Sequence, residues 1–219
     1  GVILGNGRFY TMRQNYKPYK IPTFGYPKLR LNLIIEYTDG SRQTIASDIS
    51  WKLTTEGPIR SNNEYDGEEY DARKELGDWN RTGYDDTNWI PAGRVSIPSG
   101  TLRAQMMPGM KVTESLKPVS IRKQGDKHIL DIGQNMAGWL RIRIKGQAGD
   151  SIRLRFAERL QADGEIFTKN LRDAHCTDIY VVSGREPQDT TWAPRFVYHG
   201  FRYVEISGYP NAKTEDFTA

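Results

Sequence analysis

The chain has 219 residues, which is enough for one large β domain or two ordinary domains, each with a buried core. Its one cysteine excludes an internal disulfide. One cysteine and three histidines in the whole chain are too few for a zinc site of the usual Cys/His spacing. The formal net charge of +4 is not accompanied by a nucleic-acid-binding motif, and no window approaches about 18 consecutive apolar residues, so we expect neither a nucleic-acid partner nor a membrane-spanning segment.

The first residues, "GVILGNGRFY", begin in mid-pattern, without a methionine or the basic and apolar regions of a signal peptide. We therefore expect the interior of a longer protein, and the compartment stays open between cytoplasm, periplasm and secretion. Within this stretch, Asn6, Arg8 and Tyr10 combine an amide, a guanidinium group and an aromatic ring, which are groups that bind sugars. They form the first candidate sugar-binding set.

Residues 28–47 predict two strands joined at Asp39-Gly40, which is a strong hairpin signal. One face of the first strand is apolar throughout and carries Leu29, Leu31, Leu33 and Ile35. This alternation is typical of an antiparallel sheet with one face in the core.

The segment "GEEYDAR" offers the carboxylates of Glu68, Glu69 and Asp71. A glycoside hydrolase needs two carboxylates facing each other across the scissile bond. On a strand, however, Asp71 and Arg73 share one face and lie close enough to pair. Strand neighbours point side by side rather than across a substrate, so we expect a structural ion pair and assign no catalytic residue.

The segment "WNRTGYDDTNW" carries the second candidate sugar-binding set, Trp79, Tyr84 and Trp89. Flat rings cover the apolar faces of sugar rings, although packing of the tryptophans inside the fold explains the same pattern. Between them, Asp85 and Asp86 could bind Ca²⁺ together with backbone carbonyls, or simply form a turn.

The stretch from residue 91 to residue 118 is rich in proline and predicts an extended connector between two domains. Beyond it, "LRIRIKG" and "SIRLRFAE" alternate apolar residues with arginine and lysine. We interpret the basic residues as the solvated face of an antiparallel sheet. Short strands with Asp-Gly and Gly-Asp turns, and no helical period longer than about two turns, predict all-β sandwiches.

Two histidines raise the question of nucleophilic chemistry. His175 lies near Cys176 and Asp178, but adjacent strand residues point to opposite faces, and no third group of a triad lies nearby in the sequence. His199 lies in "PRFVYHGFRYVEISG", where apolar and aromatic residues occupy both faces and Gly200 suggests a bulge or a close backbone approach. We expect His199 to be structural, and hydrogen-bonded either within the sheet or at the seam with a neighbouring domain.

Several long motifs in order resemble the β-sandwich region of bacterial α-L-rhamnosidases of glycoside hydrolase family 78. They include "LGNGRFY", "LRLNLIIEYTDGSRQTIASDISWKLTTEGPI", "YDGEEYDAR", "DIGQNMAGWLRIRIKG" and "GDSIRLRFAERLQADGEIFTKNLRDAHCTDIYVVSG". The resemblance implies an all-β fold of two antiparallel, jelly-roll-like sandwich domains, the first incomplete. The expected parts are a carbohydrate-binding-like jelly-roll at 1–91, a connector at 92–120, a second sandwich at 121–210, and the start of a linker to a catalytic barrel at 211–219.

The same resemblance implies an accessory region of an enzyme that removes terminal α-L-rhamnose from glycosides or polysaccharides by inverting hydrolysis. The catalytic carboxylates would lie in an (α/α)₆ barrel outside this chain, and some family members bind rhamnose through Ca²⁺. The implied partners are an α-L-rhamnose-containing glycan, the barrel, and strands upstream of residue 1. The alternative is a free-standing carbohydrate-binding module that uses the loops at 6–10 and 79–89.

Overall fold

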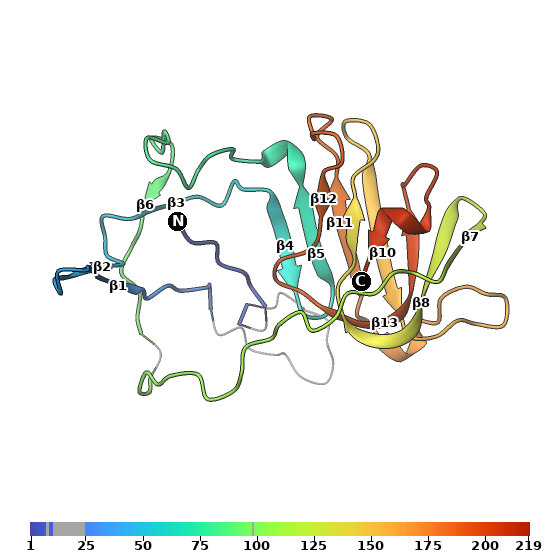
Figure 1. Cartoon of the computed structure of the whole chain (residues 1–219), viewed down its shortest axis with the longest axis horizontal. Helices are drawn as coiled ribbons and strands as arrows, with labels where there is room; N and C mark the ends of the chain where they lie inside the picture. The colour runs from blue at the N-terminus through green and yellow to red at the C-terminus, as the bar shows by residue number, and fades with distance from the viewer. Residues whose placement is uncertain (8, 11–24, 98) are drawn as a thin grey trace. The chain divides into compact units, whose positions relative to one another are not determined.

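The computed structural model describes residues 1–7, 9–10, 25–97 and 99–219, and these residues form two compact units (Figure 1). The first unit contains the described residues of 1–4, 27–56, 76–97 and 99–112, and the second contains those of 5–7, 9–10, 25–26, 57–75 and 113–219. Each unit therefore draws on more than one stretch of the sequence.

The first unit contains two small antiparallel sheets. Strand β1 (Asn32–Glu36) pairs with β2 (Arg42–Ala46), and β3 (Lys52–Leu53) pairs with β6 (Ile90–Pro91). At the turn between β1 and β2, Gly40 has a φ of 82°, and the Asp39 side chain accepts the Ser41 N–H at 2.8 Å. A left-handed backbone angle favours glycine, so the predicted hairpin is confirmed together with its chemical reason.

Apolar side chains of the first unit remain in contact with solvent. Leu33 is 52% exposed and Ile34 is 60% exposed, although the two side chains point to opposite faces of β1. None of the described residues of this unit is buried.

The second unit contains a seven-stranded sheet and a three-stranded sheet. The larger sheet has the order β4-β5-β11-β10-β13-β8-β7, and its strands lie side by side in Figure 1. Its strands are β4 (Ile59–Asn63), β5 (Gly67–Asp71), β11 (Thr177–Val181), β10 (Ser151–Ala157), β13 (His199–Ser207), β8 (Lys127–Gly138) and β7 (Ser120–Gln124). The smaller sheet has the order β12 (Thr191–Trp192), β9 (Arg141–Arg143) and β14 (Phe217–Thr218).

The two sheets of the second unit share one hydrophobic core. On β10, Ile152, Leu154 and Phe156 are completely buried, whereas the alternating arginines point outward. The other sheet contributes Ile142 and Phe217 to the same cluster. A core enclosed between two sheets is a β-sandwich, and the all-β prediction is confirmed.

Among the described residues, helical structure is limited to short 3₁₀ turns, namely η1 (Ala72–Lys74), η2 (Lys169–Leu171) and η3 (Thr214–Asp216). Across the described ranges, no helix has the length and apolar character required to cross a bilayer.

Residues 57–75 belong to the second unit, where β5 pairs in parallel with β11 and brings β4 into the larger sheet. The expected division into 1–91, 92–120, 121–210 and 211–219 stays a prediction.

Candidate functional site

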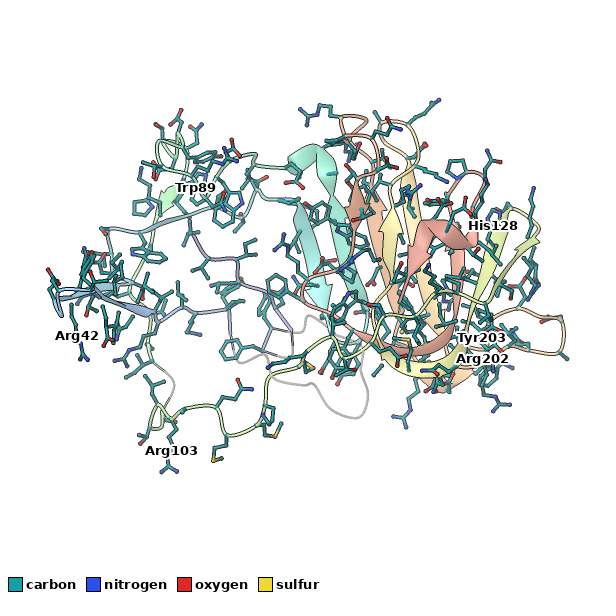
Figure 2. All side chains as sticks on the ribbon, viewed as in Figure 1. Arg42, Trp89, Arg103, His128, Arg202 and Tyr203 are labelled. Atoms are coloured by element: carbon teal, nitrogen blue, oxygen red, sulfur yellow. The ribbon has the colours of Figure 1, made fainter. Side chains whose placement is uncertain are left out.

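The aromatic residues expected to bind sugar between β3 and β6 form a cluster in the first unit. The Trp79 and Trp89 rings stack with centroids 6.4 Å apart, and Tyr84 meets Trp89 edge-on at 5.8 Å. All three are half-buried. Figure 2 labels Trp89, which immediately precedes β6. The structure therefore brings together this half of the predicted set.

Of the other expected sugar-binding residues, Asn6 and Tyr10 belong to the second unit. The Asn6 N–H donates to Asn62 Oδ1 at 2.7 Å, and the Tyr10 N–H donates to the Asn6 carbonyl at 3.1 Å. The Tyr10 ring lies 4.8 Å from the Tyr26 ring. Arg8 lies outside the described residues. The two candidate sets thus belong to different units, and sugar binding by either set stays a prediction.

The two acidic residues considered for Ca²⁺ already have other partners. Asp85 accepts hydrogen bonds from the backbone N–H and the hydroxyl of Thr87. Asp86 forms an ion pair with Lys52, with Nζ and Oδ1 2.7 Å apart. A lysine ammonium group beside the carboxylate opposes a cation, so these residues do not fit a calcium site. Among the described residues, no group of three or more acidic, histidine or cysteine side chains could hold a metal ion.

Glu68 has the electrostatic character of a general acid but is placed inside the fold. Its carboxylate accepts backbone N–H groups of Arg195 at 3.1 Å and Phe196 at 3.1 Å, and the residue is 1% exposed. Burial raises the pKa of Glu68 to about 7, against the lowering effect of those hydrogen bonds. The carboxyl group fastens the 195–196 backbone to β5 and does not meet solvent.

Asp71 is used structurally as well. Its two carboxylate oxygens accept Nε and Nη2 of Arg73, each at 2.8 Å. These hydrogen bonds hold the pKa of Asp71 below its usual value. The predicted ion pair in "GEEYDAR" is confirmed, but Arg73 lies in the 3₁₀ turn η1 rather than on the strand as expected.

A buried Cys-His-Asp cluster is the arrangement that sequence reasoning missed. His199 Nε2 lies 3.0 Å from Asp178 Oδ1, and His199 Nδ1 lies 3.3 Å from Cys176 Sγ. Phe156 stacks on the imidazole at 4.2 Å, and the Glu68 N–H donates to the same Asp178 oxygen at 3.0 Å. His199 is therefore the histidine of this cluster, and it lies 23 residues after Cys176 in the sequence.

The cluster resembles a nucleophilic triad in its atoms but not in its accessibility. Cys176 is 8% exposed, His199 3% and Asp178 0%. Burial alone would lower the pKa of His199, but the hydrogen bonds to Asp178 and Cys176 outweigh it and raise that pKa to about 9. An imidazolium paired with a carboxylate in the core links β11 to β13, so the expectation that His199 is hydrogen-bonded within the sheet is confirmed.

Local sequence patterns could not have revealed this cluster. His199 meets Asp178 only because β10 lies between β11 and β13 in the sheet, and that strand order depends on long-range pairing. The sequence suggests a bulge at Gly200. In the structure, the pairing register between β13 and β8 shifts slightly later in the strand, between Phe201 and Tyr203. At this point Arg202 forms a two-point ion pair with Asp131, at 2.9 and 3.0 Å, beside the Tyr203 ring (Figure 2).

The fold defines an all-β sandwich region whose candidate acids, Glu68 and Asp71, are hydrogen-bonded to the 195–196 backbone and to Arg73. Residues 1–114 match the family model of the α-L-rhamnosidase N-terminal domain, and residues 121–219 match that of the bacterial α-L-rhamnosidase concanavalin-like domain. The chain therefore belongs to the bacterial α-L-rhamnosidase family.

Individual relatives agree with this assignment. An α-L-rhamnosidase of Streptomyces avermitilis is 42% identical over 194 residues, covering 84% of this chain and 18% of the relative. One from Formosa agariphila is 36% identical over 216 residues, covering 95% and 22%. The chain thus spans about a fifth of the length of these curated relatives.

Two solved structures share the fold. The α-L-rhamnosidase of Dictyoglumus thermophilum superposes with a TM-score of 0.87 at 38% identity, over 99% of this chain and 23% of that one. The Streptomyces avermitilis α-L-rhamnosidase in complex with L-rhamnose superposes with a TM-score of 0.80 at 39% identity, over 86% and 18%.

Proposed function

We propose that this chain is the accessory, non-catalytic β-sandwich region of an α-L-rhamnosidase that removes terminal α-L-rhamnose from glycosides or polysaccharides. The catalytic barrel and its two carboxylates would belong to the remaining length of the protein. The observation that carries the proposal is the position of Glu68, whose pKa of about 7 suits a general acid but whose carboxyl group is enclosed in the core.

The chemistry of glycoside hydrolysis supports this assignment. An inverting enzyme places its acid and base about 6.5–9.5 Å apart, with room for the sugar and a water molecule between them. Glu68 is held by backbone N–H groups of the 195–196 segment, and Asp71 is held by Arg73 on both oxygens. Neither carboxylate is free to exchange a proton with a substrate.

A domain exchange tests the proposal. The 219-residue chain alone should not hydrolyse an aryl α-L-rhamnoside. The same chain, substituted for the matching region of the Streptomyces avermitilis enzyme, should give a folded protein that retains rhamnosidase activity. An unrelated β-sandwich of similar size at the same position is the control, and it should give an inactive protein.

Two results would contradict the proposal. One is turnover by the isolated chain that disappears in Glu68→Gln or Asp71→Asn. The other is a folded chimaera without activity, because an accessory region of this family should support the barrel of a relative.

A free-standing carbohydrate-binding module is the second candidate function, and the half-buried cluster of Trp79, Tyr84 and Trp89 favours it. Stacked rings are the groups on which sugar rings pack. In this case the isolated chain should bind L-rhamnose saturably, with or without Ca²⁺, and Trp89→Ala should weaken that binding. Arg103→Ala in the exposed 99–112 stretch is a suitable control.

A further inference from the structure

A polar groove crosses the outer face of the seven-stranded sheet, on the side away from the sandwich core. Its volume is about 470 Å³, and β4, β5, β11, β10, β13 and β8 all contribute to it. This volume lies in the range of ligand pockets, about 300–1,000 Å³. We call it the sheet groove.

The outer face is hollow because a loop covers one end of it. Leu160 and Ile166 pack with Ile129, Ala157 and Tyr203 in a small second hydrophobic cluster. Beside this cluster, two polar contacts hold the side chains of the outer face in place. Arg155 Nη2 donates to Thr168 Oγ1 at 3.3 Å, and Lys127 forms an ion pair with Glu205 at 3.2 Å. The loop therefore forms a wall, and the open part of the sheet forms the floor.

The floor is one continuous row of cross-strand neighbours. Strand pairing places five residues in register across the sheet, in the order Ser61, Glu69, Ile179, Arg153 and Ser207. Register partners project from the same face of a sheet. All five line the sheet groove.

The polar members of this row have unused hydrogen-bonding capacity. The side chains of Glu69 and Arg153 form no hydrogen bond or ion pair with any residue in the described part of the chain, and the same holds for the hydroxyl groups of Ser61 and Ser207. Glu69 and Arg153 stand on either side of Ile179, about 10 Å apart at the backbone, because neighbouring strands are about 4.8 Å apart. A carboxylate and a guanidinium group thus come from positions on either side of an apolar residue, and all three line the groove.

This pairing of charges selects the class of ligand. An anion that approached Arg153 would meet Glu69, and a cation that approached Glu69 would meet Arg153, so the row does not favour a net charge. A neutral sugar satisfies both groups, because its hydroxyls donate to a carboxylate and accept from a guanidinium. Ile179 between them offers an apolar contact to the carbon side of the ring or to a methyl group.

We propose that the sheet groove is a carbohydrate subsite for a neutral deoxy sugar of the L-rhamnose type, with Glu69 and Arg153 binding hydroxyl groups and Ile179 contacting the C6 methyl group. The proposal rests on the proposed function for the kind of sugar, and it lies in the second unit rather than at the aromatic cluster of the first. It gives the second unit a role in holding glycan beyond its role as a scaffold.

Titration of the isolated 219-residue chain with L-rhamnose, monitored through the NMR chemical shifts of the backbone amides, tests the subsite. Binding should shift amides of β5, β10, β11 and β13. Glu69→Gln and Arg153→Ala should each weaken binding about tenfold or more, since each removes a hydrogen bond to a charged group. Both side chains point away from the core, and thermal unfolding of each variant verifies that the fold is intact.

Two controls distinguish the subsite from a general effect of charge or of any sugar. Arg141→Ala removes an exposed arginine from β9 of the other sheet and should leave the affinity unchanged. L-mannose differs from L-rhamnose by a hydroxyl at C6, and it should bind roughly fourfold more weakly or worse, since it loses the contact of the methyl group with Ile179. Equal binding of the two sugars would overturn the assignment of Ile179.

Two further outcomes overturn the proposal as a whole. Binding that survives both groove variants but is lost in Trp89→Ala would place the sugar at the aromatic cluster instead. A wild-type chain that does not bind L-rhamnose even at high millimolar concentration would show that the groove is not a subsite. Neither outcome affects the domain exchange, which judges the accessory function separately.

Discussion

Strand β1 of the first unit and strand β10 of the second unit carry the same alternation of apolar and polar residues, yet only β10 buries its apolar face. Leu154 on β10 is 0% exposed, whereas Leu33 on β1 is 52% exposed. Alternation specifies which side of a strand is apolar, but burial requires a second layer to cover that side. The three-stranded sheet provides this layer in the second unit.

The difference has an energetic meaning. Complete burial of a leucine or isoleucine side chain contributes about 1.5–3 kcal/mol, and the second unit gains this at many positions. A two-stranded sheet with exposed apolar faces gains little of it and is marginally stable by itself. We therefore expect the two units to differ in stability, and the following experiments test this difference from the largest effect to the smallest.

Amide hydrogen exchange should separate the two units most clearly. Amides of β10 and β13 should exchange roughly a thousandfold more slowly than those of β1 and β2, because core strands open only with the unfolding of their unit. Mass spectrometry of the chain at low concentration measures this ratio. Uniform, strong protection of 29–47 under these conditions would show that the first unit is stable as it stands.

Replacement of His199 by alanine should destabilise the second unit by about 3–5 kcal/mol, because Asp178 would remain buried without its charged partner. Urea unfolding of wild type and variant measures the loss. His175→Ala is the matched control, since His175 is exposed, and it should change stability by less than about 0.5 kcal/mol. Equal stability of His199→Ala and wild type would show that the ion pair does not support the sandwich.

A pair of leucine truncations applies the comparison to packing alone. Leu154→Ala should cost about 2–5 kcal/mol because it leaves a cavity in the core. Leu33→Ala should cost less than about 1 kcal/mol, because half of that side chain already contacts water. Equal losses in urea unfolding would mean that β1 is packed as tightly as β10.

The stability of the second unit should fall as the pH rises. Glu68 and His199 both bind a proton more tightly in the folded chain, with pKa values raised from 4.5 to about 7 and from 6.5 to about 9. Where the folded state holds the extra proton, the unfolding free energy decreases with pH. The decrease should therefore run from about pH 4.5 to 7 for Glu68 and from about pH 6.5 to 9 for His199, and each contribution is on the order of 3 kcal/mol at most.

Urea unfolding across this range of pH, in wild type and in two variants, assigns the two windows. Glu68→Gln should remove the lower part of the decrease, and His199→Ala should remove the upper part. Asp71 and Asp131 have lowered pKa values, so their contribution is lost only in more acidic solution. A stability that increases from pH 5 to pH 9 would contradict the placement of both groups.

Features with a local cause were predictable from the sequence. The hairpin at Asp39-Gly40 follows from turn chemistry, and the alternation on β10 follows from a buried face and a solvated face. Asp71 pairs with Arg73 because it caps the 3₁₀ turn η1 that contains Arg73 two residues later. The contact of Trp79 with Trp89 also joins residues close together in the chain. In each case the information lies within about ten residues.

Features that depend on long-range strand order were not predictable in this way. The parallel pairing of β5 with β11 has no local signature, since either strand could equally form an edge. The meeting of Cys176, Asp178 and His199 depends on that same order. The sheet groove also needs five strands in register before its row of side chains exists.

The insertion of β5 beside β11 has a consequence for the order in which the protein is made. Glu68 and its hydrogen-bonding partner Asp178 are 110 residues apart, and the amino-terminal partner leaves the ribosome first. At about 5–20 residues per second, β5 waits roughly 5–20 s for the strand that pairs with it. During that interval, the unpaired edge of β5 and the side chain of Glu68, which is buried in the folded protein, are exposed to other chains. A synthesis rate that changes across residues 75–175 should therefore change the yield of folded protein more than the same change placed after residue 207.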